Sequence, residues 1–182
     1  FIMNTNYFTS EHQLFRKSLR DFLDREIVPH IDEWEEKGEI PVSAFNKLGQ
    51  MGYYGLGFEE KFGGIQTDIF YTIILVEELN KCNSAGTAAS LLSHSTLALE
   101  HLSKNGSDFL KTKYLEPGIA GEIIGCLAIS EPQAGSDVSN IQTKAEEKES
   151  YYLINGAKTF ITNGLKSDFY VAAVRTGDKG YD

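Results

Sequence analysis

The sequence has few cysteines, few basic residues for its length and no long apolar run. Its 182 residues include two cysteines, Cys82 and Cys126, which lie far apart and lack metal-ligand spacing. A disulfide framework or a zinc site is therefore disfavoured, and we expect two buried reduced thiols. No stretch approaches the roughly 18 apolar residues of a membrane helix, so no membrane span is predicted.

The shortage of basic residues also restricts the partners. Lys and Arg number 17 against 26 Asp and Glu, which gives a formal net charge of −9. Binding a nucleic acid needs a basic face, so no nucleic-acid partner is expected. The first residues, Phe1 to Asn4, show neither a signal peptide nor an Arg-rich transit peptide, although a cleaved one could already be gone.

Apolar residues recur at helical spacing over the first 120 residues. A capping-box pattern at Ser10 and Gln13 opens the first helix, which Pro29 stops. The segment 68–81 is apolar around most of its surface and predicts a helix at the centre of a helical domain. Further helices are expected at 31–37, from about 45 to a cap at Gly52, at 84–104 with a cap at Gly106, and from Ser107 or Asp108 to 119.

Glycines are dense between residues 52 and 66. Five of them, at Gly52, Gly55, Gly57, Gly63 and Gly64, indicate a shaped loop whose backbone adopts glycine-only conformations. Function or tight packing could equally require such a loop.

The pattern changes from helix to strand near residue 122. Residues 123–129 form a continuous apolar run, strands are expected at 139–146, 151–155, 157–162 and 168–175, and Asn155-Gly156 is a two-residue hairpin signal. So few strands with open edges make a poor independent domain. The predicted fold class is therefore α+β: an α-helical bundle over residues 1–122, followed by an incomplete antiparallel β-domain over 123–182.

Two segments of this β-part carry candidate binding residues. The loop 130–137 combines small residues, turn formers and hydroxyls, which suits the close approach of a ligand to backbone N–H groups, but a plain polar turn has the same composition. In the second segment, 158–164, Phe160 and Thr162 would share one face of a strand, where a ring could cover a flat ligand that the hydroxyl bonds at its edge. The alternative is an ordinary aromatic-threonine pair on a β-surface.

Other titratable residues favour structural roles. Glu77 and Glu78 are adjacent on a helix and do not share a face, so we expect one solvated and one structural carboxylate instead of a paired base. His94 and His101 share a helix face but have no third ligand nearby, and histidines so placed are more often core or surface residues. No metal is expected.

Together the two β-segments resemble a known family. Residues 128–137, Ala-Ile-Ser-Glu-Pro-Gln-Ala-Gly-Ser-Asp, and 154–164, Ile-Asn-Gly-Ala-Lys-Thr-Phe-Ile-Thr-Asn-Gly, are similar to the paired signature of the acyl-CoA dehydrogenases in order, spacing and loop chemistry. The resemblance continues upstream through 15–17, 29–35, 48–52, 62–64 and 77–79, and so covers nearly the whole chain. The helical part is most similar to the long-chain and isovaleryl-type branches, with His94-Ser95 as one point of likeness.

The resemblance implies that residues 127–136 line the flavin of FAD. It assigns cofactor contacts to Leu127, Ile129, Ser130, Gly135, Ser136, Phe160, Ile161 and Thr162. Ser136 would also meet the CoA part of the substrate, and Thr162 would donate to the N5 region of the flavin. The family more often has tryptophan at the position of Phe160.

The resemblance also implies a reaction and partners. A glutamate removes the α-proton of an acyl-CoA while the β-hydrogen leaves as hydride to the flavin. That base belongs to the family's C-terminal helical domain, so we expect no catalytic residue in residues 1–182, and we expect these residues alone to be inactive. The expected acceptor is an electron-transferring flavoprotein, the expected assembly a homotetramer, and the expected location the bacterial cytoplasm or the mitochondrial matrix. An acyl-CoA oxidase, a flavin monooxygenase and a non-catalytic truncated paralogue that serves as an interaction module remain alternatives.

Overall fold

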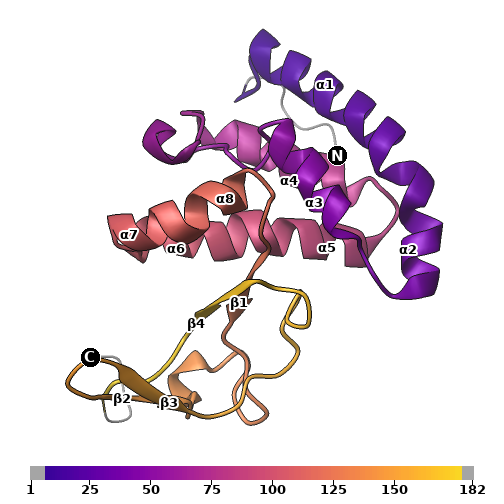
Figure 1. The fold of residues 1–182 in the computed structure, drawn as a ribbon. Helices are drawn as coiled ribbons and strands as arrows, with labels where there is room; N and C mark the ends of the chain where they lie inside the picture. Colours follow the sequence, from indigo (N-terminus) through magenta and orange to yellow (C-terminus); the bar gives the residue numbers. More distant parts are fainter. Residues whose placement is uncertain (1–6, 178–182) are drawn as a thin grey trace.

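The computed structural model describes residues 7–177, which form a helical part followed by a smaller part built of strands and loops (Figure 1). This order confirms the predicted fold class. No helix in the described range is long and apolar enough to cross a bilayer. The α-helices are α1 (Ser10–Glu26), α2 (Ile31–Lys37), α3 (Val42–Gln50), α4 (Ile69–Asn80), α5 (Ala85–Leu92), α6 (Glu100–Asn105), α7 (Asp108–Leu110) and α8 (Glu116–Ile119).

Helix α1 begins one residue earlier than its sequence pattern suggests. Thr9, not Ser10, is the cap: its hydroxyl accepts the backbone N–H of His12, and Nδ1 of His12 accepts the backbone N–H of Thr9. The prediction of a Ser10–Gln13 box was wrong because an imidazole nitrogen can take the accepting role of Gln or Glu. Nε2 of His12 also lies 3.0 Å from Asp68, the cap of α4, and thus ties α1 to α4.

Each of the last two predicted helices, at 84–104 and from Ser107 or Asp108 to 119, contains a π-helical segment. The predicted helix 84–104 forms as α5, the π-segment η4 (Ser93–Leu99) and α6, and the hydroxyl of Ser84 caps its start. Gly106 ends it as the predicted cap residue, with an extended backbone of φ −75° and ψ 144°. Likewise α7, the π-segment η5 (Lys111–Leu115) and α8 form the predicted helix after Ser107.

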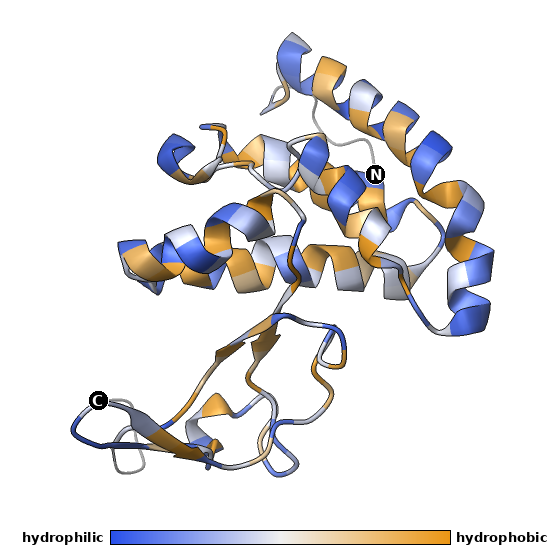
Figure 2. Ribbon diagram, in the orientation of Figure 1, coloured by the Kyte–Doolittle hydropathy of each residue, from blue (hydrophilic) through white to orange (hydrophobic). Residues whose placement is uncertain are grey.

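The core of the helical part lies where α1 packs on α4. Leu19 and Leu23 of α1 and Ile74 and Leu79 of α4 are completely buried. Figure 2 shows apolar and polar residues alternating in bands along α1, as expected for a helix with one buried face. The prediction that α4 is buried on several sides holds only in part, because Ile69 at its start is 64% exposed.

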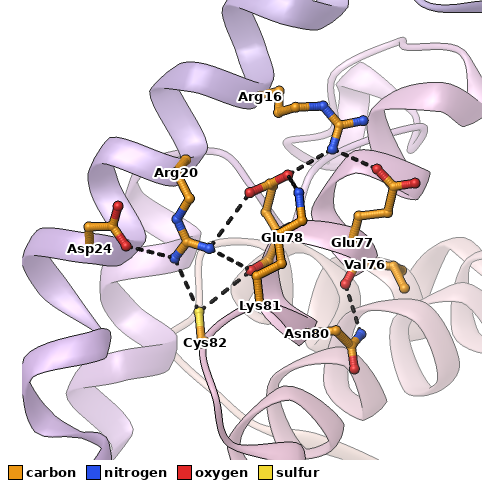
Figure 3. A network of polar contacts seen from close by, with 9 residues as sticks. All are labelled: Arg16, Arg20, Asp24, Val76, Glu77, Glu78, Asn80, Lys81 and Cys82. Carbon is orange, nitrogen blue, oxygen red and sulfur yellow. Dashed lines mark hydrogen bonds and ion pairs between the residues drawn. The ribbon is translucent and has the colours of Figure 1, made fainter. Parts of the chain in front are cut away.

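A charged network joins α1 to the end of α4 (Figure 3). Arg16 Nη1 lies 2.6 Å from Glu77 and 2.7 Å from Glu78, so the two carboxylates, which were expected to diverge, both reach one guanidinium. Burial favours a higher pKa for Glu78, but hydrogen bonds from Lys81 and Arg16 lower it below the ordinary value. Glu78 is therefore a buried structural carboxylate.

Arg20 also donates to the sulfur of Cys82, and both cysteines are buried thiols, as expected.

The β-part contains two separate strand pairs. Strand β1 (Gly125–Ala128) pairs with β4 (Phe169–Ala172) in parallel, with Gly125 opposite Phe169. Strands β2 (Lys144–Glu147) and β3 (Tyr152–Asn155) form an antiparallel hairpin. The expectation of a wholly antiparallel arrangement thus holds for one pair only.

The predicted strand at 157–162 does not form, and Asn155-Gly156 does not turn a hairpin. The β2–β3 hairpin turns instead at residues 148–151. A Cβ at Gly156 would lie 2.5 Å from Cα of Thr143, so the chain passes close to the preceding segment here. It then leaves the sheet, and Phe160 and Asn163 take positive φ values of 54° and 65°, which an extended strand does not contain.

A buried histidine connects the helical part to the first strand. Nε2 of His94, on η4, lies 3.0 Å from the carbonyl of Gly118, and Nδ1 accepts the N–H of Gly125 at 3.0 Å. A carbonyl can only accept and an N–H can only donate, so the ring is neutral with its proton on Nε2. The rings of Phe45 and Tyr54 pack edge-on against it. His94 is thus a core residue, one of the roles the sequence favoured, while His101 is on the surface.

We expect the free energy of unfolding to fall as pH drops from 6.5 to 4. Burial lowers the pKa of His94 from 6.5 to about 4, so in this window the unfolded chain binds a proton that the folded chain does not. The loss should approach about 3 kcal/mol near pH 4. Urea unfolding at each pH, with His94→Gln as the non-titrating comparison, measures it. If both proteins show the same slope, His94 is not the titrating group.

Candidate functional site

The two segments that the sequence singled out lie side by side in the structure. After β1 the chain forms a tight turn in which Glu131 and Ala134 exchange backbone hydrogen bonds of 2.8 and 3.1 Å. The backbone N–H of Thr159 donates to the carbonyl of Ser130 at 2.9 Å. Lys158 Nζ donates to the carbonyl of Ile129 at 2.9 Å. Residues 129–134 and 158–159 are therefore bound into one unit.

Glu131 holds this unit together from inside. It is 4% exposed, and its carboxylate accepts from Lys158 at 2.7 Å, from the backbone N–H groups of Gln142 and Thr143, and from the side chain of Gln133. Burial would raise the pKa of this carboxyl, but the hydrogen bonds, led by that from Lys158, hold it at about 2. A group ionised so strongly is a poor proton acceptor near neutral pH. The structure thus gives Glu131 a positioning role and not that of a base.

The candidate flavin contacts differ in exposure. Leu127, Ile129, Ser130 and Ile161 are partly buried, whereas Gly135, Ser136, Phe160 and Thr162 are exposed. A Cβ added at Gly135 would meet no atom within 4 Å, so the space beside this backbone is open to a ligand. Because residues 157–162 are not a strand, the argument that Phe160 and Thr162 share a strand face is wrong for this chain. Phe160 is 97% exposed and reaches its position through a left-handed backbone conformation.

A cavity of about 390 Å³ lies between this segment and the helical part. Ile161, Thr162 and Asn163 form one side, and Thr87 and Ser90 of α5 form the other. Its remaining walls are mainly apolar, with Trp34, Ile40, Phe45, Ile124 and Leu165 among them. Of the eight residues predicted to touch cofactor, Ile161 and Thr162 line this cavity; the other six do not.

Two residue pairs, Asn163 with Ser90 and Lys166 with Glu39, connect the 161–166 segment to the helical part across this cavity. Ser90 donates to Oδ1 of Asn163 at 2.5 Å, and Nδ2 of Asn163 donates to the carbonyl of Ser90 at 2.9 Å. On the other side Lys166 forms an ion pair with Glu39, in the connection between α2 and α3. The sequence predicted neither contact, because none of the four residues has a local signal for a partner in a distant segment.

No metal site accompanies the cavity in the part of the chain that is described: no three His, Cys, Asp or Glu side chains gather within residues 7–177 so as to hold an ion. The polar groups at the cavity are instead hydroxyls, an amide, the Lys166–Glu39 ion pair and the carboxylate of Glu35, which accepts from Ser84. Such groups suit an organic ligand.

Comparison with known protein families decides the relationship. Residues 9–122 match the model of the acyl-CoA dehydrogenase N-terminal domain, and residues 126–182 match that of the acyl-CoA dehydrogenase middle domain. The chain belongs to the acyl-CoA dehydrogenase family. The resemblance seen in the sequence is thereby confirmed.

Individual relatives and solved structures are similar over nearly the whole chain. The long-chain specific mitochondrial enzyme of Mus musculus is 37% identical over 169 residues, which cover 93% of this chain and 39% of that protein. The crystal structure of an acyl-CoA dehydrogenase from Geobacillus kaustophilus superposes with a TM-score of 0.85 at 38% identity, covering 93% of this chain and 44% of that one. The FAD complex of PigA gives a TM-score of 0.89 at 28% identity, covering 95% and 46%. The chain therefore spans about two fifths of the length of the acyl-CoA dehydrogenases it matches.

Proposed function

We propose that the protein is an FAD-dependent acyl-CoA dehydrogenase that converts an acyl-CoA to the trans-2-enoyl-CoA. The observation that carries this proposal is the union of the 129–134 turn and the 158–162 segment beside a cavity that reaches into the helical part. In this proposal residues 1–122 are the helical domain, and residues 123–182 belong to the β-domain.

The residues at this site fit a flavin. Phe160 offers a fully exposed aromatic ring, which can cover a flat heterocycle. Among the described residues nothing donates to or accepts from the hydroxyl of Thr162, so this group is free to bond a ligand. Open space beside Gly135 allows the cofactor to approach the backbone. When bound, FAD supplies the acceptor for the hydride that leaves the β-carbon of the substrate.

In this proposal the side chains of residues 1–182 bind and orient the cofactor and the substrate. Ser130 and Thr162 present hydroxyls toward the cofactor, and Ser136 contacts cofactor or the CoA part of the substrate. The acyl chain enters the apolar cavity between Ser90 and Ile161. By the family resemblance the α-proton goes to a glutamate of the C-terminal helical domain. Glu131 is engaged and too acidic to accept it.

The proposal also includes an electron acceptor, an oligomeric state and a cellular location. Electrons pass on to an electron-transferring flavoprotein, the enzyme is a homotetramer, and it acts in the bacterial cytoplasm or the mitochondrial matrix. Oxygen uptake without that flavoprotein would point instead to an acyl-CoA oxidase.

We expect Ser136→Trp to weaken FAD or acyl-CoA binding at least tenfold in the complete enzyme. The residue is exposed on the 130–137 loop beside Gly135, and an indole there would fill the space that a ligand must enter. The helical core is remote from this loop, so the thermal stability of the apoprotein should stay unchanged. Flavin absorbance after purification and isothermal titration with acyl-CoA provide the measurement.

The matched control is Ser136→Ala, which removes the hydroxyl without adding bulk. It should retain FAD and lose little affinity, since a neutral hydrogen bond contributes only about 1 kcal/mol. Normal flavin content and normal substrate affinity in Ser136→Trp would show that the loop lies outside the site and would refute its proposed role.

A further inference from the structure

A second cavity of about 390 Å³ lies wholly within the helical part. Leu56, Gly57 and Phe58 of the glycine-rich loop form one wall, and Ser95 and Thr96 of the π-segment η4 form another. No residue in the described range lines both this cavity and the one beside Thr162. The second cavity is therefore separate from the proposed acyl-CoA site.

Some of the buried hydroxyls at this cavity have no hydrogen-bond partner among the described residues, those of Tyr54 and Thr67 among them. Tyr54 is 1% exposed and Thr67 is partly buried, and neither Oη of Tyr54 nor Oγ1 of Thr67 finds a partner in the described structure. Both residues line the cavity. An unsatisfied buried hydroxyl costs about 1–3 kcal/mol, so native proteins rarely retain one without a ligand or an ordered water.

The glycine-rich loop is shaped around this cavity. Gly57, with φ 79°, receives no contact on the side where a Cβ would stand, and its N–H donates to the carbonyl of Ile65 at 2.9 Å. The N–H of Ile65 in turn donates to the carbonyl of Gly55 at 2.7 Å. These bonds close the loop on itself and hold Leu56 and Phe58 at the cavity. Packing explains Gly64, whose Cβ would lie 2.3 Å from the carbonyl of Phe58, and the positive φ explains the exposed Gly57.

The chemistry of the lining selects the ligand. Leu56, Phe58 and Leu75 provide apolar walls. Burial raises the pKa of Tyr54 well above 10, so its hydroxyl stays a neutral donor. Asp68, bonded to His12, and Glu100, paired with Lys104, also line the cavity, so their carboxylates disfavour an anionic ligand such as a carboxylate or phosphate.

We propose that this cavity is a second ligand site, which binds a small uncharged molecule with an apolar body and a carbonyl or hydroxyl oxygen that accepts from Tyr54 and Thr67. The site is independent of the proposed dehydrogenase function, and its test needs neither FAD nor acyl-CoA.

The test uses 4-fluoroacetophenone as the probe, titrated against the purified protein and followed by fluorine NMR. Saturable binding is expected. Its near-isostere 4-fluoro-α-methylstyrene, which has a methylene in place of the oxygen, should bind several-fold more weakly. Tyr54→Phe should raise the ketone Kd about five- to tenfold, and Thr67→Val should raise it by a similar factor, because each removes one donor. The styrene Kd should be the same for all three proteins.

Stability without the probe gives an independent readout. Because no described residue pairs with the Tyr54 hydroxyl, Tyr54→Phe should melt close to the parent, which shows that the variant is folded when its Kd is measured. The proposal would be overturned by equal ketone Kd values for the parent and both variants, by no saturable binding, or by a crystal structure of the soaked protein with only ordered water in the cavity.

Discussion

Lys158→Met is expected to lower the free energy of unfolding by about 3–5 kcal/mol at pH 7, because it leaves a buried carboxylate without its cation. The side chain of Lys158 is 13% exposed, and its Nζ lies 2.7 Å from Oε1 of Glu131. The same nitrogen donates to the carbonyl of Ile129, so the substitution also removes side-chain links between the two candidate site segments and leaves the backbone bond from Thr159 to Ser130. Urea unfolding at pH 7 measures the loss.

Two comparisons identify the cause. Lys148→Met breaks an exposed ion pair with Glu146 and should cost less than about 1 kcal/mol. In the parent protein the pKa of Glu131 is lowered from 4.5 to about 2, so its stabilisation is complete above pH 4.5 and is lost as pH falls toward 2. Lys158→Met should lose most of this acid dependence. If it costs no more than Lys148→Met, the buried pair does not stabilise the turn.

Helical elements were readable from the sequence because each depends on local spacing. The α1 periodicity and the helix at 31–37 both appear in the structure as predicted. The capping residue of α1 was misread by one position because the partner at N3 is a histidine, which side-chain patterns do not associate with this role.

Local sequence patterns could not predict the contacts between distant segments. The alternation from Lys158 to Thr162 has the period of a strand, yet no neighbouring strand is placed to pair with it in the described structure. The segment instead bonds to the turn after β1 and, through Asn163, to Ser90 on α5. Only the three-dimensional arrangement brings these residues together. The family resemblance nevertheless predicted that the segments 128–137 and 154–164 form one site, although each segment alone was ambiguous.

The same arrangement makes Thr162 the most informative residue for catalysis. If Thr162 donates to the flavin as we propose, Thr162→Val should slow flavin reduction by about 10²–10³-fold in the complete enzyme, because it removes a donor to charge that develops in the transition state. Valine has nearly the same shape, and the hydroxyl of Thr162 makes no hydrogen bond within residues 7–177, so the fold should be unaffected. The measurement is stopped-flow bleaching of the flavin by saturating acyl-CoA under anaerobic conditions.

The size of this effect separates a catalytic contact from a structural one. Thr159→Val is the matched control: it lies in the same segment, contacts Ser130 through its backbone N–H and does not line the cavity, so flavin reduction should stay within about twofold of the parent. A structural role for Thr162 would lower thermal stability and flavin content in Thr162→Val while leaving the reduction rate of the remaining holoenzyme intact. A catalytic contact should do the opposite, with full flavin content, an unchanged melting temperature and a slow reduction step. An unchanged reduction rate at full occupancy would remove Thr162 from the flavin site.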